Sequence, residues 1–162
     1  MPNKENMDHS IEALSCHTHH IPDISAAFHR QWSHLVPGKS LEDVENSVRL
    51  RTNTDKLPMA FVAVDGEGEW IGTVSLKMHD LDTRNDLSPW LASLFVKEEH
   101  RRRGVGKSLM ERACERAKSL GISDLYLYTD LKEGFYRTLG WALAERQNFH
   151  GQEIATMTLS LI

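Results

Sequence analysis

The sequence predicts one α/β domain with a mixed sheet. Three observations support this. The chain has 162 residues, which suits a single hydrophobic core. Apolar stretches of strand length alternate with amphipathic stretches of helical period. No repeat or linker divides the chain, so residues 1–162 are expected to form one domain, with only the polar residues 1–10 as a flexible terminus.

Two helices are expected before the main sheet, after a first strand that could begin at residues 11–14. Asp23 is positioned to cap the first helix, whose apolar residues recur at helical spacing over 26–35. Ser40 followed by Asp43 resembles a capping box and predicts the second helix, which carries an apolar stripe to Leu50.

Three strands are expected in the middle of the chain. Residues 59–64 and about 70–78 flank an Asp-Gly pair at 65–66, a strong hairpin signal. The polar stretch 79–89 is rich in turn residues and indicates a loop. Residues 90–96 are almost all apolar, which is typical of a central strand buried on both faces.

The rest of the chain alternates helices and strands and closes with an antiparallel pair. The expected elements are a helix over 104–120, a strand over 124–129, a short helix over 133–139, and paired strands over 141–147 and 153–161.

Composition excludes several classes of protein. The formal net charge is -4, so general attraction to nucleic acid or to an anionic membrane is not expected. No stretch approaches the roughly 20 apolar residues that span a bilayer, and the first residues do not resemble a signal peptide. The two cysteines, Cys16 and Cys114, suggest no disulfide framework. We therefore expect a cytoplasmic protein, either a monomer or a homodimer.

One segment concentrates positive charge and glycine after a buried strand. The basic residues Arg101–Arg103 precede Gly104 and Gly106, which open a helix. Glycines let the backbone approach a ligand closely, and a helix begins with unpaired N–H groups at the positive end of its dipole. The segment therefore predicts a cradle for a diphosphate. It lacks the first glycine of a P-loop, and a dinucleotide fingerprint would need glycine at Leu109.

The spacing Arg101-x-x-Gly104-x-Gly106 resembles the Q/R-x-x-G-x-G/A signature of the GNAT superfamily of acetyl-CoA-dependent N-acyltransferases. A second stretch, Phe135-Tyr136-Arg137-Thr138-Leu139-Gly140-Trp141, resembles the family's FYxxxGF end of a short helix. The resemblance implies a mixed, mostly antiparallel sheet that is flanked by helices and splays between its fourth and fifth strands. It also implies transfer of an acetyl group from acetyl-CoA to an amine.

The resemblance assigns residues by position. Tyr136 would lie near the sulfur and donate a proton to the departing thiolate, and Thr129 would lie beside the cofactor. The residues expected to bind acetyl-CoA with Thr129 are Leu94, Phe95, Val96, Arg101, Arg102, Arg103, Gly104, Val105, Gly106, Lys107 and Ser108.

The acceptor side departs from the family, because the expected fourth strand has no carboxylate to act as general base. Substitutes are His79, Asp80, Asp82, Asp86 and Asp130, or a water chain relayed by Ser93. The residues expected to shape the pocket for a small-molecule or peptide amine are His79, Asp80, Asp82, Asp86, Trp90 and Ser93. The missing carboxylate also leaves an alternative open, a non-catalytic sensor or interaction module that binds coenzyme A.

The segment Cys16-His17-Thr18-His19-His20 contains good metal ligands. It has no second ligand cluster at a recognisable spacing, so we interpret it as a polar connection and expect no metal. The competing interpretation, metal handling, predicts zinc or copper in the purified protein.

Overall fold

The computed structural model describes residues 9–162. Its strands are β1 (His9–Ala13), β2 (Met59–Asp65), β3 (Trp70–Lys77), β4 (Trp90–Val96), β5 (Asp124–Thr129), β6 (Ala142–Phe149) and β7 (Gln152–Ser160). Its α-helices are α2 (Ile21–Trp32), α3 (Leu41–Arg49), α4 (Val105–Ser119) and α5 (Glu133–Thr138). The predicted order of elements is confirmed.

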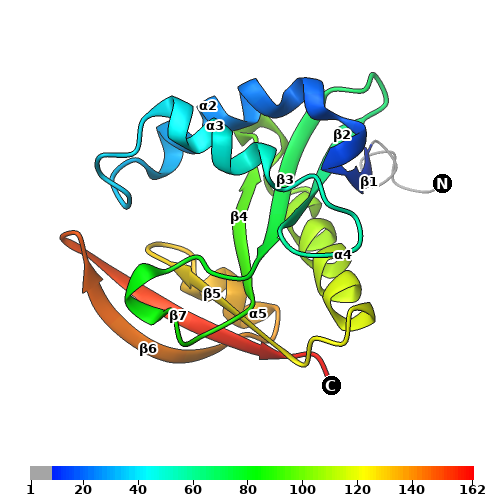
Figure 1. Cartoon of the computed structure of the whole chain (residues 1–162). Coiled ribbons are helices and arrows are strands. Elements are labelled where there is room, and N and C mark those ends of the chain that lie inside the picture. Colours follow the sequence, from blue (N-terminus) through cyan, green and yellow to red (C-terminus); the bar gives the residue numbers. More distant parts are fainter. Residues whose placement is uncertain (1–8) are drawn as a thin grey trace.

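The seven strands form one sheet in the order β1-β2-β3-β4-β5-β7-β6 (Figure 1). All neighbouring strands are antiparallel except β4 and β5, which are parallel. The mixed, mostly antiparallel sheet is therefore as predicted. None of the helices described is both long enough and apolar enough to cross a membrane.

Side-chain alternation along β2 explains why helices cover both faces of the sheet. Ala60, Val62 and Val64 belong to the apolar cluster that contains α2 and part of α3. Phe61 and Ala63 belong to the cluster that contains the buried residues of α4. Because successive strand residues point to opposite faces, an apolar run buries both faces only when each is covered.

Two expectations about the amino-terminal part were wrong. Asp23 does not cap α2, because the helix begins at Ile21 with Pro22 in its first turn, a position that suits proline. The Asp23 carboxylate instead accepts a 2.7 Å hydrogen bond from Trp70 Nε1. Residues 9 and 10 of the expected flexible terminus belong to β1, whereas residues 1–8 lie outside the described part.

The capping box of α3 is confirmed. The Ser40 hydroxyl accepts from the Asp43 main-chain N–H at 3.0 Å, and the Asp43 carboxylate accepts from the Ser40 N–H at 3.0 Å. Two N–H groups at this helix end are therefore satisfied reciprocally.

The expectation that β4 is buried on both faces holds only for its first three residues, 90–92. Ser93, Leu94, Phe95 and Val96 are half-buried. The exposure begins where β4 leaves its parallel neighbour, and this change positions the candidate site.

Candidate functional site

The parallel strands β4 and β5 separate after one point of contact. They pair at Trp90 and Tyr126, where the Tyr126 N–H also donates to the Pro89 carbonyl at 3.1 Å. No further register pair joins them in the described chain, and in Figure 1 they diverge toward their carboxyl ends. Main-chain groups of the second half of β4 therefore lack a partner strand on the β5 side.

A β-bulge lies in β4, just beyond the point where this strand pairs with β5. Thr73 pairs with Phe95 and Ser75 pairs with Ala92, so β4 has one more residue than β3 between these pairs. Within the bulge Ser93 has a positive φ of 54°. Bulges bend a strand and redirect its side chains, and they are frequent beside functional sites. This bulge re-aims the residues that follow Ser93.

The amino end of α4 lies beside the carboxyl end of β4. Gly104 precedes the helix with a φ of 81°, a backbone conformation that glycine adopts without strain. No side chain caps the helix there, so its first N–H groups lack a side-chain acceptor. A Cβ on Gly106 would lie 3.6 Å from Phe135 and 3.7 Å from Val96, so Gly106 faces both β4 and α5. These features suit the binding of an anion at the amino end of α4.

Arg101 ties this turn to β4. Its Nε donates to the Val96 carbonyl at 2.8 Å, and its guanidinium lies 5.8 Å from the centre of the Phe95 ring. Arg102, Arg103 and the Lys107 side chain remain exposed. The turn therefore presents three exposed positive charges beside the amino end of α4.

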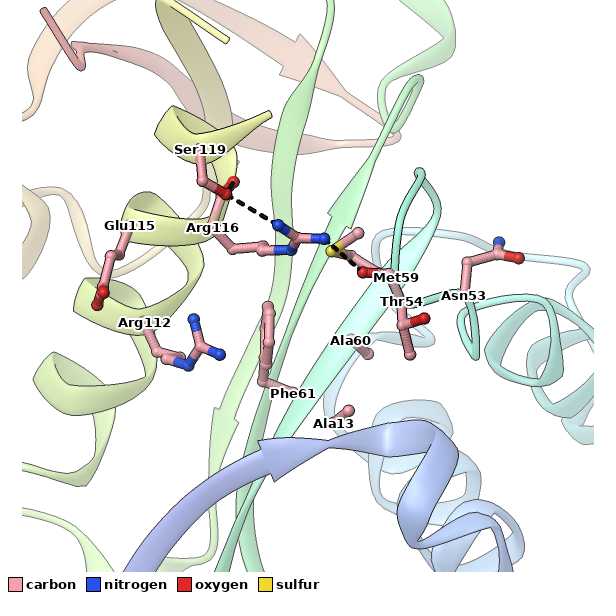
Figure 2. A pocket seen from close by; sticks show the side chains of 10 residues that line it. All are labelled: Ala13, Asn53, Thr54, Met59, Ala60, Phe61, Arg112, Glu115, Arg116 and Ser119. Atoms are coloured by element: carbon pink, nitrogen blue, oxygen red, sulfur yellow. Dashed lines mark hydrogen bonds between the residues drawn. The ribbon is translucent and has the colours of Figure 1, made fainter. Parts of the chain in front are cut away.

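Two grooves mark the surface. One of about 430 Å³ lies between the end of β4 and α2, and Phe95, Lys97 and Arg101 contribute to its wall. Another of about 370 Å³ lies between α4 and β2, where Arg116 donates to the Thr54 carbonyl at 2.7 Å (Figure 2). The second groove contains none of the site residues predicted from the sequence.

Tyr136 lies in α5 and belongs to the core cluster that includes Trp141. Its ring meets those of Phe135 and Trp141 edge-on, at centroid distances of 5.2 and 6.3 Å. Burial raises the pKa of the Tyr136 hydroxyl, so the group stays protonated at neutral pH. Thr129 is buried at the end of β5, where its hydroxyl accepts from the Lys132 N–H at 3.0 Å.

The residues expected on the acceptor side have different surroundings. Trp90 was wrongly expected in the pocket, because it is completely buried and its Nε1 donates to the Leu87 carbonyl at 2.7 Å. Asp80 pairs with Lys77 at 3.0 Å, and Asp86 pairs with Arg84 at 2.9 Å.

His79 and Asp82 are exposed in the loop between β3 and β4. Asp130, which follows β5, has a carboxylate oxygen 2.9 Å from His34 Nε2. Arg84 also reaches Glu145 of β6 at 2.6 Å, which anchors this loop to the far hairpin. The loop acids and Asp130 are thus held by different segments.

Three residues near these acids were missed by sequence reasoning. Tyr128 is largely buried, and desolvation followed by the charges of Asp80, Asp82 and Asp130 raises its pKa. His34 bridges the α2–α3 connection to the end of β5. Arg51 is buried and donates to the Ser93 hydroxyl at 3.0 Å. His34 and Arg51 lie far in sequence from these partners, so no local motif could have revealed their contacts.

Comparison with known proteins agrees with this geometry. Residues 21–141 match the model of the acetyltransferase (GNAT) family. An uncharacterized N-acetyltransferase of Chlorobaculum tepidum is 27% identical over 89 residues. That match covers 55% of this chain and 54% of the other, so the chain spans about half the length of this curated relative.

Solved structures share the fold. An aminoglycoside 6'-N-acetyltransferase complexed with coenzyme A matches with a TM-score of 0.71 and 20% identity, over 94% of this chain and 97% of that one. A spermidine/spermine N-acetyltransferase from Vibrio cholerae matches with a TM-score of 0.68 and 18% identity, over 97% and 95%. Because the family model covers more than half of the sequence, the chain belongs to the GNAT acetyltransferase family.

Proposed function

We propose that this protein is an N-acetyltransferase that moves the acetyl group of acetyl-CoA to a primary amine of a small molecule or peptide. One observation carries the proposal: the uncapped amino end of α4 lies where β4 and β5 separate. Unpaired N–H groups at a helix end bind phosphate, and a split sheet leaves strand main chain free for an extended arm. The GNAT membership of the chain and the coenzyme A in a structural neighbour support the same assignment.

The residues proposed for acetyl-CoA divide by the part of the molecule they would hold. The main chain of 101–108 would bind the diphosphate, with charge-assisted contacts from Arg102, Arg103 and Lys107. Leu94–Val96 would offer main-chain groups to the pantetheine arm and the thioester carbonyl. Thr129 would lie across the cleft from them.

The reaction needs a donor for the oxyanion and a proton for the leaving thiolate. A preorganised N–H of β4 can meet the first need, because the strand has no partner there. Tyr136 is proposed for the second, because its buried hydroxyl stays protonated. Direct attack in a ternary complex is proposed. Neither cysteine suits an acyl-enzyme, because Cys16 lies before α2 and Cys114 lies within α4.

Among the candidate acids, Asp130 has the strongest support, as the group that orients His34 to act as the base. The Arg84 hydrogen bond lowers the pKa of Asp86, which makes Asp86 a poor proton acceptor. Asp130 instead orients the His34 imidazole, whose other ring nitrogen is able to accept a proton from the acceptor ammonium. His34 and Asp130 meet at the carboxyl end of β5.

A thiol-release assay tests the proposal. Purified protein is mixed with acetyl-CoA and a panel of primary amines, and free coenzyme A is followed over time. We expect amine-dependent release that falls in Tyr136→Phe. Binding of acetyl-CoA without release from any amine would favour the alternative, a non-catalytic module that binds coenzyme A.

A further inference from the structure

Arg51 is a buried cation that has no ion-pair partner among the residues that the structure describes. Its side chain follows α3 and is only 5% exposed. Nη1 donates to the hydroxyls of Ser75 and Ser93, each at 3.0 Å, and Nη2 donates to Ser47 at 3.1 Å. Its Nε has no hydrogen-bond partner among residues 9–162, and no carboxylate of that part of the chain bonds to the guanidinium.

This arrangement leaves a positive charge uncompensated. Burial lowers the pKa of the Arg51 guanidinium, yet an arginine keeps its proton in proteins. The carboxylate whose charge acts on it is Asp80, which is itself paired with Lys77. A buried charge without an opposite charge is strongly unfavourable. An anion bound in function would supply the missing charge.

Ser93 links Arg51 to the part of β4 that has no partner strand on the β5 side. It stands in the β4 bulge and is half-buried, whereas Arg51 lies behind it. Because the Ser93 oxygen accepts a hydrogen bond from a cation, its own proton is free to be donated outward. Ser93 is therefore a polarised donor, which argues against the water chain that it was expected to relay to a base.

We propose that the acceptor amine also carries a carboxylate, which binds at Ser93 with Arg51 as its counter-charge. This inference rests on the proposed acetyltransferase function and narrows its substrate class to amino acids and related molecules. A purely cationic polyamine would meet repulsion at this point. The same positive charge lowers the pKa of a nearby acceptor ammonium, which favours the neutral amine that attacks the thioester.

The test uses pairs of acceptors that differ only in the carboxylate, such as lysine and cadaverine, and amino acids and their primary amides. For pairs that are substrates, we expect wild-type kcat/KM to favour the carboxylate member by at least about 100-fold. An acceptor without the carboxylate would leave the buried donors of the site unpaired when it binds. Arg51→Gln should reduce the preference to within about threefold, mainly through KM. Arg51→Lys should retain part of it, and Ser93→Ala should weaken it without removing Arg51.

Calorimetry separates this inference from the proposed function. Binding of acetyl-CoA should be unchanged in all three variants, and the same acceptor pairs are titrated into the protein saturated with coenzyme A. Equal use and equal binding of both members of every pair by wild-type protein would overturn the inference. An Arg51→Gln variant that lowers kcat/KM equally for both members of a pair would also overturn the inference. Absence of all turnover would count against the enzyme, whereas the binding titration would still decide the carboxylate preference.

A separate group of imidazoles, the histidine cluster of His17, His19 and His20, precedes α2. One ring nitrogen of each lies within 4.8 Å of the others. His17 Nε2 lies 2.8 Å from a Glu12 carboxylate oxygen, and His20 Nε2 lies 2.9 Å from the Gly68 carbonyl. Metal-binding histidines usually hold their second nitrogen against a carboxylate or carbonyl in this way, which fixes the orientation of the ring.

We infer that the histidine cluster binds Zn²⁺ through three imidazoles, with the fourth position left to water. The sequence led us to expect no metal, because the segment has no second ligand cluster at a recognisable spacing. The observation that changes this is the orientation of two rings by partners outside the segment.

Calorimetry of tag-free protein with Zn²⁺ tests the histidine cluster. We expect one equivalent to bind, and His19→Ala or His17→Gln to weaken binding at least about tenfold. His150→Ala, an exposed histidine in the β6–β7 turn, is the matched control and should bind as the wild type does. Failure of the wild type to bind, or unchanged affinity in His19→Ala, would overturn the inference.

Discussion

The two sides of the proposed site differ in the groups that would contact a ligand, which are main-chain groups on one side and side chains on the other. The side proposed for the cofactor, here called the cofactor wall, is formed by residues 94–96 and 101–108, mostly through main-chain groups. The side proposed for the acceptor, here called the acceptor wall, consists of the side chains of His34, Asp80, Ser93 and Asp130, with Arg51 buried behind Ser93. Main-chain groups suit a ligand that is the same in every reaction cycle, as the proposed cofactor acetyl-CoA would be. Side chains from separate segments can change individually and so set which amine is accepted.

The largest effect is expected at Tyr136 of α5, which belongs to neither wall. Tyr136→Phe should lower kcat about 100-fold, because the leaving thiolate loses its proton donor. Affinity for coenzyme A should stay the same. Since the pKa of Tyr136 is raised, the hydroxyl loses its proton only at alkaline pH, and kcat should not fall on this account below about pH 10. Steady-state kinetics across pH would measure both.

Phe135→Leu is the matched control for Tyr136, because Phe135 is its partly exposed neighbour in α5. It should keep kcat within about threefold. A Tyr136→Phe enzyme as active as the wild type would show that Tyr136 serves packing alone.

An intermediate effect is expected from the charges of the cofactor wall. The double variant Arg102→Gln with Arg103→Gln should weaken coenzyme A binding about tenfold, because charge-assisted contacts to phosphate are lost. The loss should shrink in high salt, which screens exposed charges. Lys118→Gln, at the opposite end of α4, should change nothing, and calorimetry at two ionic strengths would compare them. A loss equal in both variants would mean that net charge alone attracts the ligand.

A smaller effect, on the acceptor wall alone, is expected from the helix cap of α3. Ser40→Ala should lower the free energy of unfolding by about 1 kcal/mol, because the Asp43 N–H loses its acceptor. Because α3 leads into Arg51, the acceptor KM should rise while coenzyme A affinity is retained. Denaturant unfolding would measure the first effect, and Ser40→Asn, which restores a capping side chain, should reverse it. If Ser40→Ala weakened acceptor binding and coenzyme A binding equally, the division of the site into a cofactor wall and an acceptor wall would be contradicted.

The smallest effect is expected at Cys114. Burial raises the pKa of its thiol to about 11, so the group remains protonated and unreactive near neutral pH. Cys114→Ala should therefore leave kcat within about twofold, and alkylation should label the exposed Cys16 first. Trapping of an acetyl group on Cys114 would refute direct transfer.

The contrast between the walls also explains what the sequence could predict. The strands, the Ser40–Asp43 cap and the glycine turn depend on neighbours in the chain, so local patterns indicated them. The convergence of Arg51 with Ser93, and of His34 with Asp130, depends on contacts made 42 and 96 residues apart. Trp90 was misjudged for the related reason that an apolar strand pattern does not say which residues line the cleft and which lie beneath it.

Binding of coenzyme A to Gly106 variants tests the central claim most directly. The wild type should bind coenzyme A in calorimetry, and Gly106→Ala should still bind, because its Cβ would make only ordinary contacts with Phe135 and Val96. Gly106→Leu should weaken binding at least about 100-fold, because its side chain would fill the space before the helix end. Wild-type protein that does not bind coenzyme A, or a folded Gly106→Leu variant that binds it normally, would contradict the account.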